Sequence, residues 1–171
     1  GAGLNSSYTS SWGNTGLGVD LSHVSIASNN LGYRSRQLVT LFMEHQFILG
    51  KRLDLTPGIA VNYYSDFGGF AYPGIDLGFQ ISTNWTAYAN LGYTYRIPTY
   101  TDLYYADRTT VGNENLKPEE ALATELGIRY NLSSFRFYAA YFDRRADNLI
   151  DYVKSLEDAP WEATNIQTLD S

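Results

Sequence analysis

Polar and apolar residues alternate along most of this chain. The clearest alternation covers residues 85–96, where every second residue, such as Leu91 or Tyr93, is apolar and the residues between, such as Asn90 and Thr94, are mostly polar or small. A period of two predicts a β-strand with one apolar and one polar face. The same pattern predicts eight strands, at residues 4–12, 16–28, 37–49, 52–64, 70–82, 85–96, 122–132 and 135–145.

The lengths of the connections alternate as well. Short turns fall at residues 13–15, 50–51, 83–84 and 133–134, and longer connections fall at residues 29–36, 65–69, 97–120 and beyond 145. Tight turns at one end and long loops at the other predict an all-β, up-and-down antiparallel meander. Its strands, each of about 9 to 13 residues, exceed the usual length in soluble sheets and approach that of the tilted strands that cross a bilayer.

The longest internal connection, residues 97–120, is expected to have a defined shape. Loops of this length in compact domains are usually functional or ordered by their own contacts. Thr99 followed by Asp102 matches a common helix-start pattern. We therefore expect a single helical turn that packs Leu103, Tyr104 and Tyr105 against the base of the loop.

Composition and charge exclude several classes of protein. The chain has no cysteine, which rules out disulfides and thiolate metal sites. Its net charge is -6, without a basic cluster, and this argues against nucleic acid as a partner. The longest apolar run, Leu38 to Met43, is far too short for a membrane-spanning helix. Because the first residues contain neither an initiator Met nor a signal region, we expect the 171 residues to be part of a longer protein.

The sequence contains no recognisable catalytic motif. His23 and His45 lack the spacing of metal ligands, and neither a Gly-x-Ser-x-Gly elbow nor a phosphate-binding glycine loop occurs. We therefore expect no enzyme, no cofactor and no metal, so that an outer-membrane lipase or protease barrel has little support. The acidic residues between Asn113 and Glu120 leave calcium open as an alternative, although they lack the spacing of a dedicated site.

The polar faces of the predicted strands carry charged residues, among them Asp20, Glu44, Asp76 and Arg129. A narrow barrel filled by side chains would have to pair these charges, whereas a wide, wet or plugged lumen accommodates them. A soluble antiparallel sandwich or a lipocalin-like barrel has the same periodicity, and periodicity alone leaves that alternative open. Strand length and the alternation of loop lengths favour the membrane barrel.

Two motifs in the second half of the chain carry a family resemblance. Residues 112–119 read Gly-Asn-Glu-Asn-Leu-Lys-Pro-Glu, and residues 124–127 read Thr-Glu-Leu-Gly. This pair of motifs resembles the barrel of TonB-dependent outer-membrane receptors. That family usually reads Gly-Asn-Pro-x-Leu-Lys-Pro-Glu and then x-Glu-x-Gly. In this sequence Glu114 replaces the usual Pro. Matching segments at residues 55–60, 147–150 and 164–166 extend the resemblance over about residues 45 to 166.

The resemblance implies a multi-pass β-barrel of about 22 strands in the outer membrane of a Gram-negative cell. Such a barrel is filled by an amino-terminal plug and imports a scarce nutrient, such as a ferric siderophore, haem, cobalamin or a glycan, with energy relayed by TonB. The implied partners are outer-membrane lipid, TonB, the plug and a small extracellular nutrient ligand. Residues 1–171 would form a partial barrel domain of central-to-late strands, and they contain no plug-like segment or TonB box.

Residues in the long connections are the candidates for contact with the ligand. Tyr and Trp offer rigid stacking surfaces, and Arg offers a planar fork of donors for anionic groups. The six preferred candidates are Arg34, Tyr100, Tyr104, Tyr105, Arg108 and Trp161. The same connections also offer Tyr33, Arg36, Asp66, Phe67, Tyr152 and Lys154. The alternative function is a soluble β-sandwich or barrel that binds carbohydrate through exposed aromatic residues.

Overall fold

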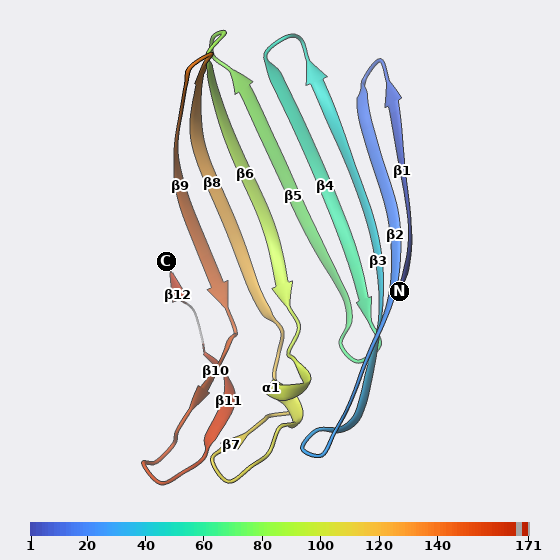
Figure 1. Ribbon diagram of the computed structural model, residues 1–171, viewed down its shortest axis with the longest axis vertical. Helices are drawn as coiled ribbons and strands as arrows, with labels where there is room; N and C mark the ends of the chain where they lie inside the picture. The colour runs from blue at the N-terminus through green and yellow to red at the C-terminus, as the bar shows by residue number, and fades with distance from the viewer. Residues whose placement is uncertain (167–168, 171) are drawn as a thin grey trace.

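A computed structural model describes residues 1–166 and 169–170 of the chain. Eight long antiparallel strands form one curved sheet (Figure 1), which confirms the predicted meander. The order in the sheet is β1-β2-β3-β4-β5-β6-β8-β9-β12, where β12 is the short Leu169–Asp170. The long strands are β1 (Ala2–Ser10), β2 (Gly13–Ser28), β3 (Gly32–Leu49), β4 (Leu53–Tyr64), β5 (Gly68–Gln80), β6 (Trp85–Arg96), β8 (Glu119–Leu132) and β9 (Phe135–Asp147).

The connection between β2 and β3 differs from the prediction. Residues 29–36 were expected to be a polar loop, but only residues 29–31 form a turn, and β3 begins at Gly32, whose φ of 68° lies in the left-handed region. Ser28 pairs directly with Gly32, so Arg34 and Arg36 lie on a strand. The prediction was wrong because the strand continues past its apolar part, and polar residues do not end it.

The register gives the sheet an apolar face and a polar face. Side chains on the apolar face are exposed; Leu91 is 43% and Leu126 is 52% exposed. A soluble sandwich would need a second sheet packed against this face. Within the described residues the only other sheet, of three short strands, lies beyond the end of the long ones (Figure 1), so the sandwich alternative is wrong. None of the described helices is long and apolar enough to cross a membrane.

Large side chains on the polar face lie over glycines of the neighbouring strand. The ring of Phe42 occupies the space that a Cβ at Gly18 would need, and the ring of Tyr88 does the same at Gly127. Glycine in a strand often marks such a close approach. These contacts order the polar face without a second layer of structure.

Short elements gather at the end of the sheet opposite the tight turns (Figure 1). They are helix α1 (Tyr100–Tyr104) and the strands β7 (Thr110–Val111), β10 (Leu149–Val153) and β11 (Trp161–Ile166), which form a sheet in the order β10-β11-β7. A small core of Leu103, Leu116 and Ala163 holds them together. The segment after residue 145, expected to be a long connection, therefore contains an ordered hairpin.

Candidate ligand-binding site at the loop end of the sheet

Helix α1 is the element that positions the candidate site. Thr99 caps it: the Thr99 hydroxyl accepts a hydrogen bond from the Asp102 backbone N–H at 3.1 Å, and the Asp102 carboxylate accepts one from the Thr99 N–H at 2.9 Å. This reciprocal capping box confirms the predicted helical turn. Leu103 is buried at its base, whereas Tyr105 is the C-cap and adopts an extended conformation.

Two arginines of β3 stack on the two tyrosines of α1. The guanidinium carbon of Arg34 lies 3.8 Å from the centre of the Tyr104 ring, and that of Arg36 lies 5.1 Å from the Tyr100 ring. Arg36 also donates to Asp66 Oδ2 at 2.8 Å and to the carbonyl oxygen of Pro98 at 3.1 Å. Both arginines therefore face flat aromatic surfaces, and the Arg36 side chain is 14% exposed with its charge paired to Asp66.

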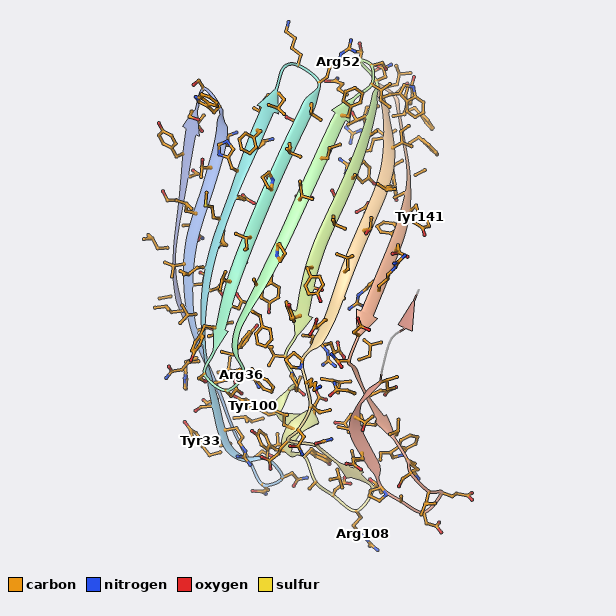
Figure 2. The ribbon with its side chains drawn as sticks, turned by 180° about the vertical axis from the view of Figure 1, so that it is seen from behind. Tyr33, Arg36, Arg52, Tyr100, Arg108 and Tyr141 are labelled. Carbon is orange, nitrogen blue, oxygen red and sulfur yellow. The ribbon has the colours of Figure 1, made fainter. Side chains whose placement is uncertain are left out.

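The structure thus brings together three of the six preferred candidates, Arg34, Tyr100 and Tyr104, with Arg36, which the sequence analysis also named. The Tyr100 and Tyr104 rings are 6.5 Å apart. Burial raises the pKa of the Tyr100 hydroxyl, so it stays protonated and can donate, as it does to the Val24 carbonyl oxygen at 3.4 Å. Figure 2 shows Arg36 and Tyr100 close together at the loop end.

The other three candidates lie elsewhere. Tyr105 donates to Asp107 Oδ2 at 2.9 Å, within a turn whose N–H groups, first that of Thr109, lower the pKa of Asp107 to about 2. Arg108 lies at the tip of an outer loop (Figure 2). Trp161 begins β11, pairs with β7, and has the Lys154 ammonium 5.3 Å from its ring.

An ion-pair network beneath α1 contains residues that the sequence analysis did not select. Arg96, the last residue of β6, donates to both carboxylate oxygens of Glu119, the first residue of β8, at 2.7 and 2.6 Å. The same carboxylate accepts the Ile150 N–H at 2.7 Å, and Arg96 lies 3.5 Å from Asp102. This ion pair could have been predicted from the sequence, because Arg96 and Glu119 flank the long loop. In the structure they pair across the β6–β8 ladder.

Tyr152 of β10 connects this network to the second sheet. Its hydroxyl donates to Asp102 Oδ1 at 3.5 Å. Burial and the negative charge of Asp102 raise the pKa of Tyr152, which keeps the hydroxyl protonated. Asp102 therefore caps α1 and joins β6 and β10 at the same time.

The motif at residues 112–119 holds the long loop in place and does not form part of the candidate binding surface. A Cβ at Gly112 would lie 2.8 Å from backbone atoms of Leu103 and Tyr104, so only glycine fits there. The Asn113 amide donates to the Ala163 carbonyl oxygen at 3.1 Å, and Leu116 fills the small core. The motif thus fastens the long loop to β11.

Asn165 completes the support from the other side. Its side chain accepts from the Lys117 N–H at 2.8 Å and donates to the carbonyl oxygens of Lys117 and Asn148 at 2.9 and 2.7 Å. Glu119, one of the acidic residues considered for calcium, uses its oxygens for Arg96 and Ile150. Among the described residues, no group of three His, Cys, Asp or Glu side chains comes together to hold a metal ion.

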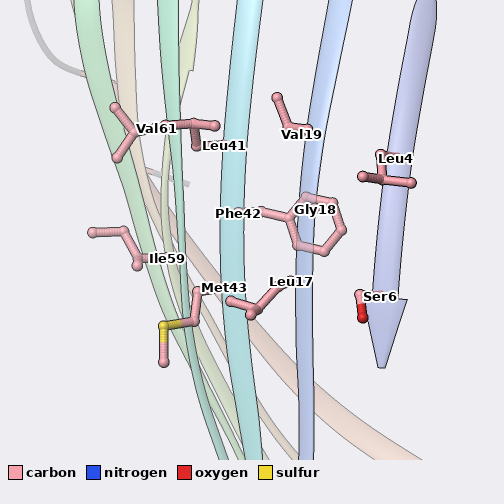
Figure 3. Close-up of a pocket in the computed structure, with 10 residues that line it drawn as sticks. All are labelled: Leu4, Ser6, Leu17, Gly18, Val19, Leu41, Phe42, Met43, Ile59 and Val61. Atoms are coloured by element: carbon pink, nitrogen blue, oxygen red, sulfur yellow. The ribbon is translucent and has the colours of Figure 1, made fainter. Parts of the chain in front are cut away.

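Hollows in the sheet surface lie away from this cluster. A groove of about 450 Å³ on the apolar face is lined by residues of β1 to β4, such as Leu17, Leu41 and Ile59 (Figure 3). A smaller one, of about 230 Å³, lies on the polar face beside Glu44, Asp76 and Gly58. The first has almost no polar atoms with which to orient a polar ligand. The stacked arginines and tyrosines at the loop end are therefore the better candidate for a recognition surface.

Comparison with protein families gives a match over almost the whole chain. The family described as TonB dependent receptor-like, beta-barrel matches residues 2–170. The vitamin B12 transporter BtuB of Vibrio vulnificus (strain CMCP6) is 26% identical over 133 residues, which make up 78% of this chain and 20% of that protein.

Solved structures share the same fold. The siderophore receptor PirA from Pseudomonas aeruginosa superposes with a TM-score of 0.86 at 20% identity and covers 97% of this chain and 33% of PirA. A variant of the ferric enterobactin receptor PfeA from Pseudomonas aeruginosa, in complex with enterobactin, gives a TM-score of 0.81 at 20% identity, over 97% of this chain and 31% of PfeA. The chain thus spans a fifth to a third of the length of these relatives.

Proposed function

This chain belongs to the TonB-dependent receptor family of outer-membrane β-barrels, which are transporters and not enzymes, and we propose that it forms part of the wall of a nutrient receptor. In this proposal residues 1–171 supply central-to-late strands of a barrel of about 22 strands. The rest of the wall, the plug and the segment that contacts TonB belong to the full-length receptor.

The proposed orientation places the apolar face against outer-membrane lipid and the polar face toward the barrel interior. It is supported by the wide exposure of Leu17, Leu41 and Leu126, each about half accessible on a single-layered sheet. Contiguous exposed apolar surface of this kind is rare on soluble monomers and marks a membrane or protein contact. The charged residues of the opposite face would then meet water or the plug.

The proposed ligand is a small nutrient that arrives from outside the cell and meets the loop end first. The observation that carries this proposal is the cluster of Arg34, Arg36, Tyr100 and Tyr104, which offers cationic forks beside flat rings. Such a surface suits anionic or aromatic parts of a ferric siderophore, haem, cobalamin or a glycan. Because BtuB is named a vitamin B12 transporter and PirA and PfeA siderophore receptors, cobalamin and ferric siderophores are the first candidates.

Uptake by the full-length receptor tests the proposal. Cells that carry the receptor as their only transporter for a given nutrient are supplied with radiolabelled cobalamin, ferric siderophores, haem or glycans. We expect TonB-dependent uptake of one of them, and we expect Arg34→Gln to weaken its binding by roughly tenfold, or about 1.4 kcal/mol.

The matched control is Arg52→Gln, the same change in the tight turn at the opposite end of the sheet (Figure 2). It should leave binding within about twofold of the parent receptor, since Arg52 is far from the loop end. Failure of every nutrient class to enter the cells, with the receptor present in the outer membrane, would exclude the proposed function.

A further inference from the structure

Three polar side chains lie on the polar face of the sheet, directly below the loop-end cluster. Tyr64 ends β4, two residues before Asp66, and Asn62 lies two residues further down the same strand. Because side chains two residues apart in a strand share a face, both point toward the proposed barrel interior. The Tyr72 hydroxyl of β5 meets the Tyr64 hydroxyl at 3.4 Å. We call Asn62, Tyr64 and Tyr72 the polar trio.

The hydrogen bonds within the polar trio leave two groups without a partner. Asn62 Nδ2 donates to the Tyr64 hydroxyl at 3.2 Å. The two tyrosine hydroxyls share one of their two protons, so one O–H donor remains for another acceptor. Asn62 Oδ1 is buried, and none of the described residues donates to it. The polar trio therefore holds a donor and an acceptor that both lack a partner within the described part of the chain.

Reversal of the Asn62 amide would not satisfy it. Its oxygen would then accept from Tyr64, but its nitrogen would take the buried position without an acceptor. Buried polar groups in proteins nearly always have a hydrogen-bond partner, so the unpaired oxygen indicates a donor that the described residues do not supply. The contact between the two tyrosine hydroxyls is long, because such bonds usually measure about 2.7–2.8 Å. A polar group that enters between them replaces only a weak bond and reaches the amide.

The polar trio borders a hollow with room for part of a ligand. Tyr72 lines the hollow of about 230 Å³ on the polar face, together with Thr56, Glu44 and Asp76. A single bridging water, whose share of liquid volume is about 30 Å³, would occupy only a small part of it. The hydroxyl and carboxylate oxygens around the hollow accept hydrogen bonds. The hollow therefore suits a ligand group that brings several donors.

We propose that the polar trio and this hollow bind a neutral part of the nutrient that carries hydroxyl or amide groups. A hydroxyl or a primary amide both donates and accepts, so it can donate to Asn62 Oδ1 and accept the free tyrosine proton. The carboxylates of Glu44 and Asp76 accept from further donors and repel an anionic group. The inference rests on the proposed function and narrows its ligand: the nutrient has neutral donor groups in addition to any part that contacts Arg34.

Binding to the purified full-length receptor tests this inference. Isothermal titration calorimetry is carried out with cyanocobalamin, ferric enterobactin and maltohexaose, which carry amide or hydroxyl groups, and with haem, whose polar side groups are carboxylates. We expect one of the first three probes to bind. Tyr72→Phe, which removes only a hydroxyl, should weaken that binding roughly fivefold. Binding of haem alone would overturn the proposal.

Asn62→Leu separates a ligand contact from a structural role. It nearly keeps the size of the side chain and removes the unpaired buried oxygen. Thermal unfolding of the receptor should therefore occur at the same or a higher temperature, while binding of the probe weakens roughly fivefold. A lower unfolding temperature with unchanged binding would show that Asn62 is only structural.

Tyr138→Phe is the matched control for Tyr72→Phe. Tyr138 lies on the polar face of β9, is 78% exposed, and is separated from the hollow by β6 and β8. Its variant should leave binding within about twofold of the parent receptor. Weaker binding in Arg34→Gln but unchanged binding in Tyr72→Phe and Asn62→Leu would overturn this inference and leave the proposed function intact. Failure of every nutrient class to bind would overturn both.

Discussion

Removal of the Glu119 side chain tests the ion-pair network that supports the strap, the connection of residues 97–118 between β6 and β8. Glu119→Ala takes away the acceptor of three hydrogen bonds, two from Arg96 and one from the Ile150 N–H. Hydrogen bonds to a charged group contribute about 1.5–3 kcal/mol each. The Arg96 side chain is 46% exposed and can turn to water, so its two bonds count for less than that.

The Ile150 N–H lies in a part-buried strand and cannot turn to water. Loss of its acceptor should therefore cost about 1–3 kcal/mol. Together these contributions give a local destabilisation of about 3 kcal/mol. Because about 1.4 kcal/mol corresponds to tenfold in an equilibrium constant, local opening should become on the order of 100-fold more frequent.

Hydrogen exchange of the purified full-length receptor measures this opening directly. Amides of residues 97–118 and 149–153 should exchange on the order of 100-fold faster in Glu119→Ala, while those of β2 to β4 keep their protection. Glu162→Ala, at an exposed position of β11, is the control and should change little. Exchange in the strap that stays within about threefold of the parent would refute the network as its support.

Two further pairs of variants test the assignment of the faces. Gly127→Ala must displace the tyrosine ring that covers it and should cost about 1–3 kcal/mol. Gly92→Ala, with no atom within 4 Å of the new Cβ, should be neutral or stabilise by about 0.5–1 kcal/mol. Denaturant unfolding in lipid vesicles measures both, and equal losses would contradict the packing. Leu126→Arg on the apolar face should cost about 2–4 kcal/mol if it meets the bilayer core, and Ala140→Arg on the polar face less than about 1 kcal/mol. Similar costs in the same unfolding assay would refute the lipid-facing orientation.

The strands could be predicted because their signal is local. Alternation of apolar and polar residues marked all eight long strands, and residues 85–96 were found with the same bounds that β6 has in the structure. The end of β2 at Ser28 was also found, but the start of β3 at Gly32 could not be found in this way. Arg34 and Arg36 are polar and lie outside the apolar part of the strand, so a rule based on hydrophobic period placed them in a loop.

The candidate site was only partly predictable, for a different reason. The capping pair of Thr99 and Asp102 is three residues apart, and its helix was found. The stack of Arg34 on Tyr104 joins residues seventy positions apart, one on β3 and the other on α1, and depends on the path of residues 97–118. No local pattern encodes that path, so Arg34 and Tyr104 were selected for their chemistry and not as partners.

The buried contacts of residues 112–119 and the stacking contacts of α1 with β3 have different roles. Residues 112–119 carry the strongest sequence motif, and their contacts all lie on the buried side. Gly112 fits closely against the backbone of α1, Leu116 packs in the small core, and the Glu119 carboxylate accepts from Arg96. The stacking residues of α1 and β3 lie outside that motif, and only Tyr104 among them packs against the small core. Substitution of Tyr100 or Arg34 should therefore change ligand preference while the buried side keeps residues 97–118 folded, and within this cluster we expect specificity to reside in these two residues.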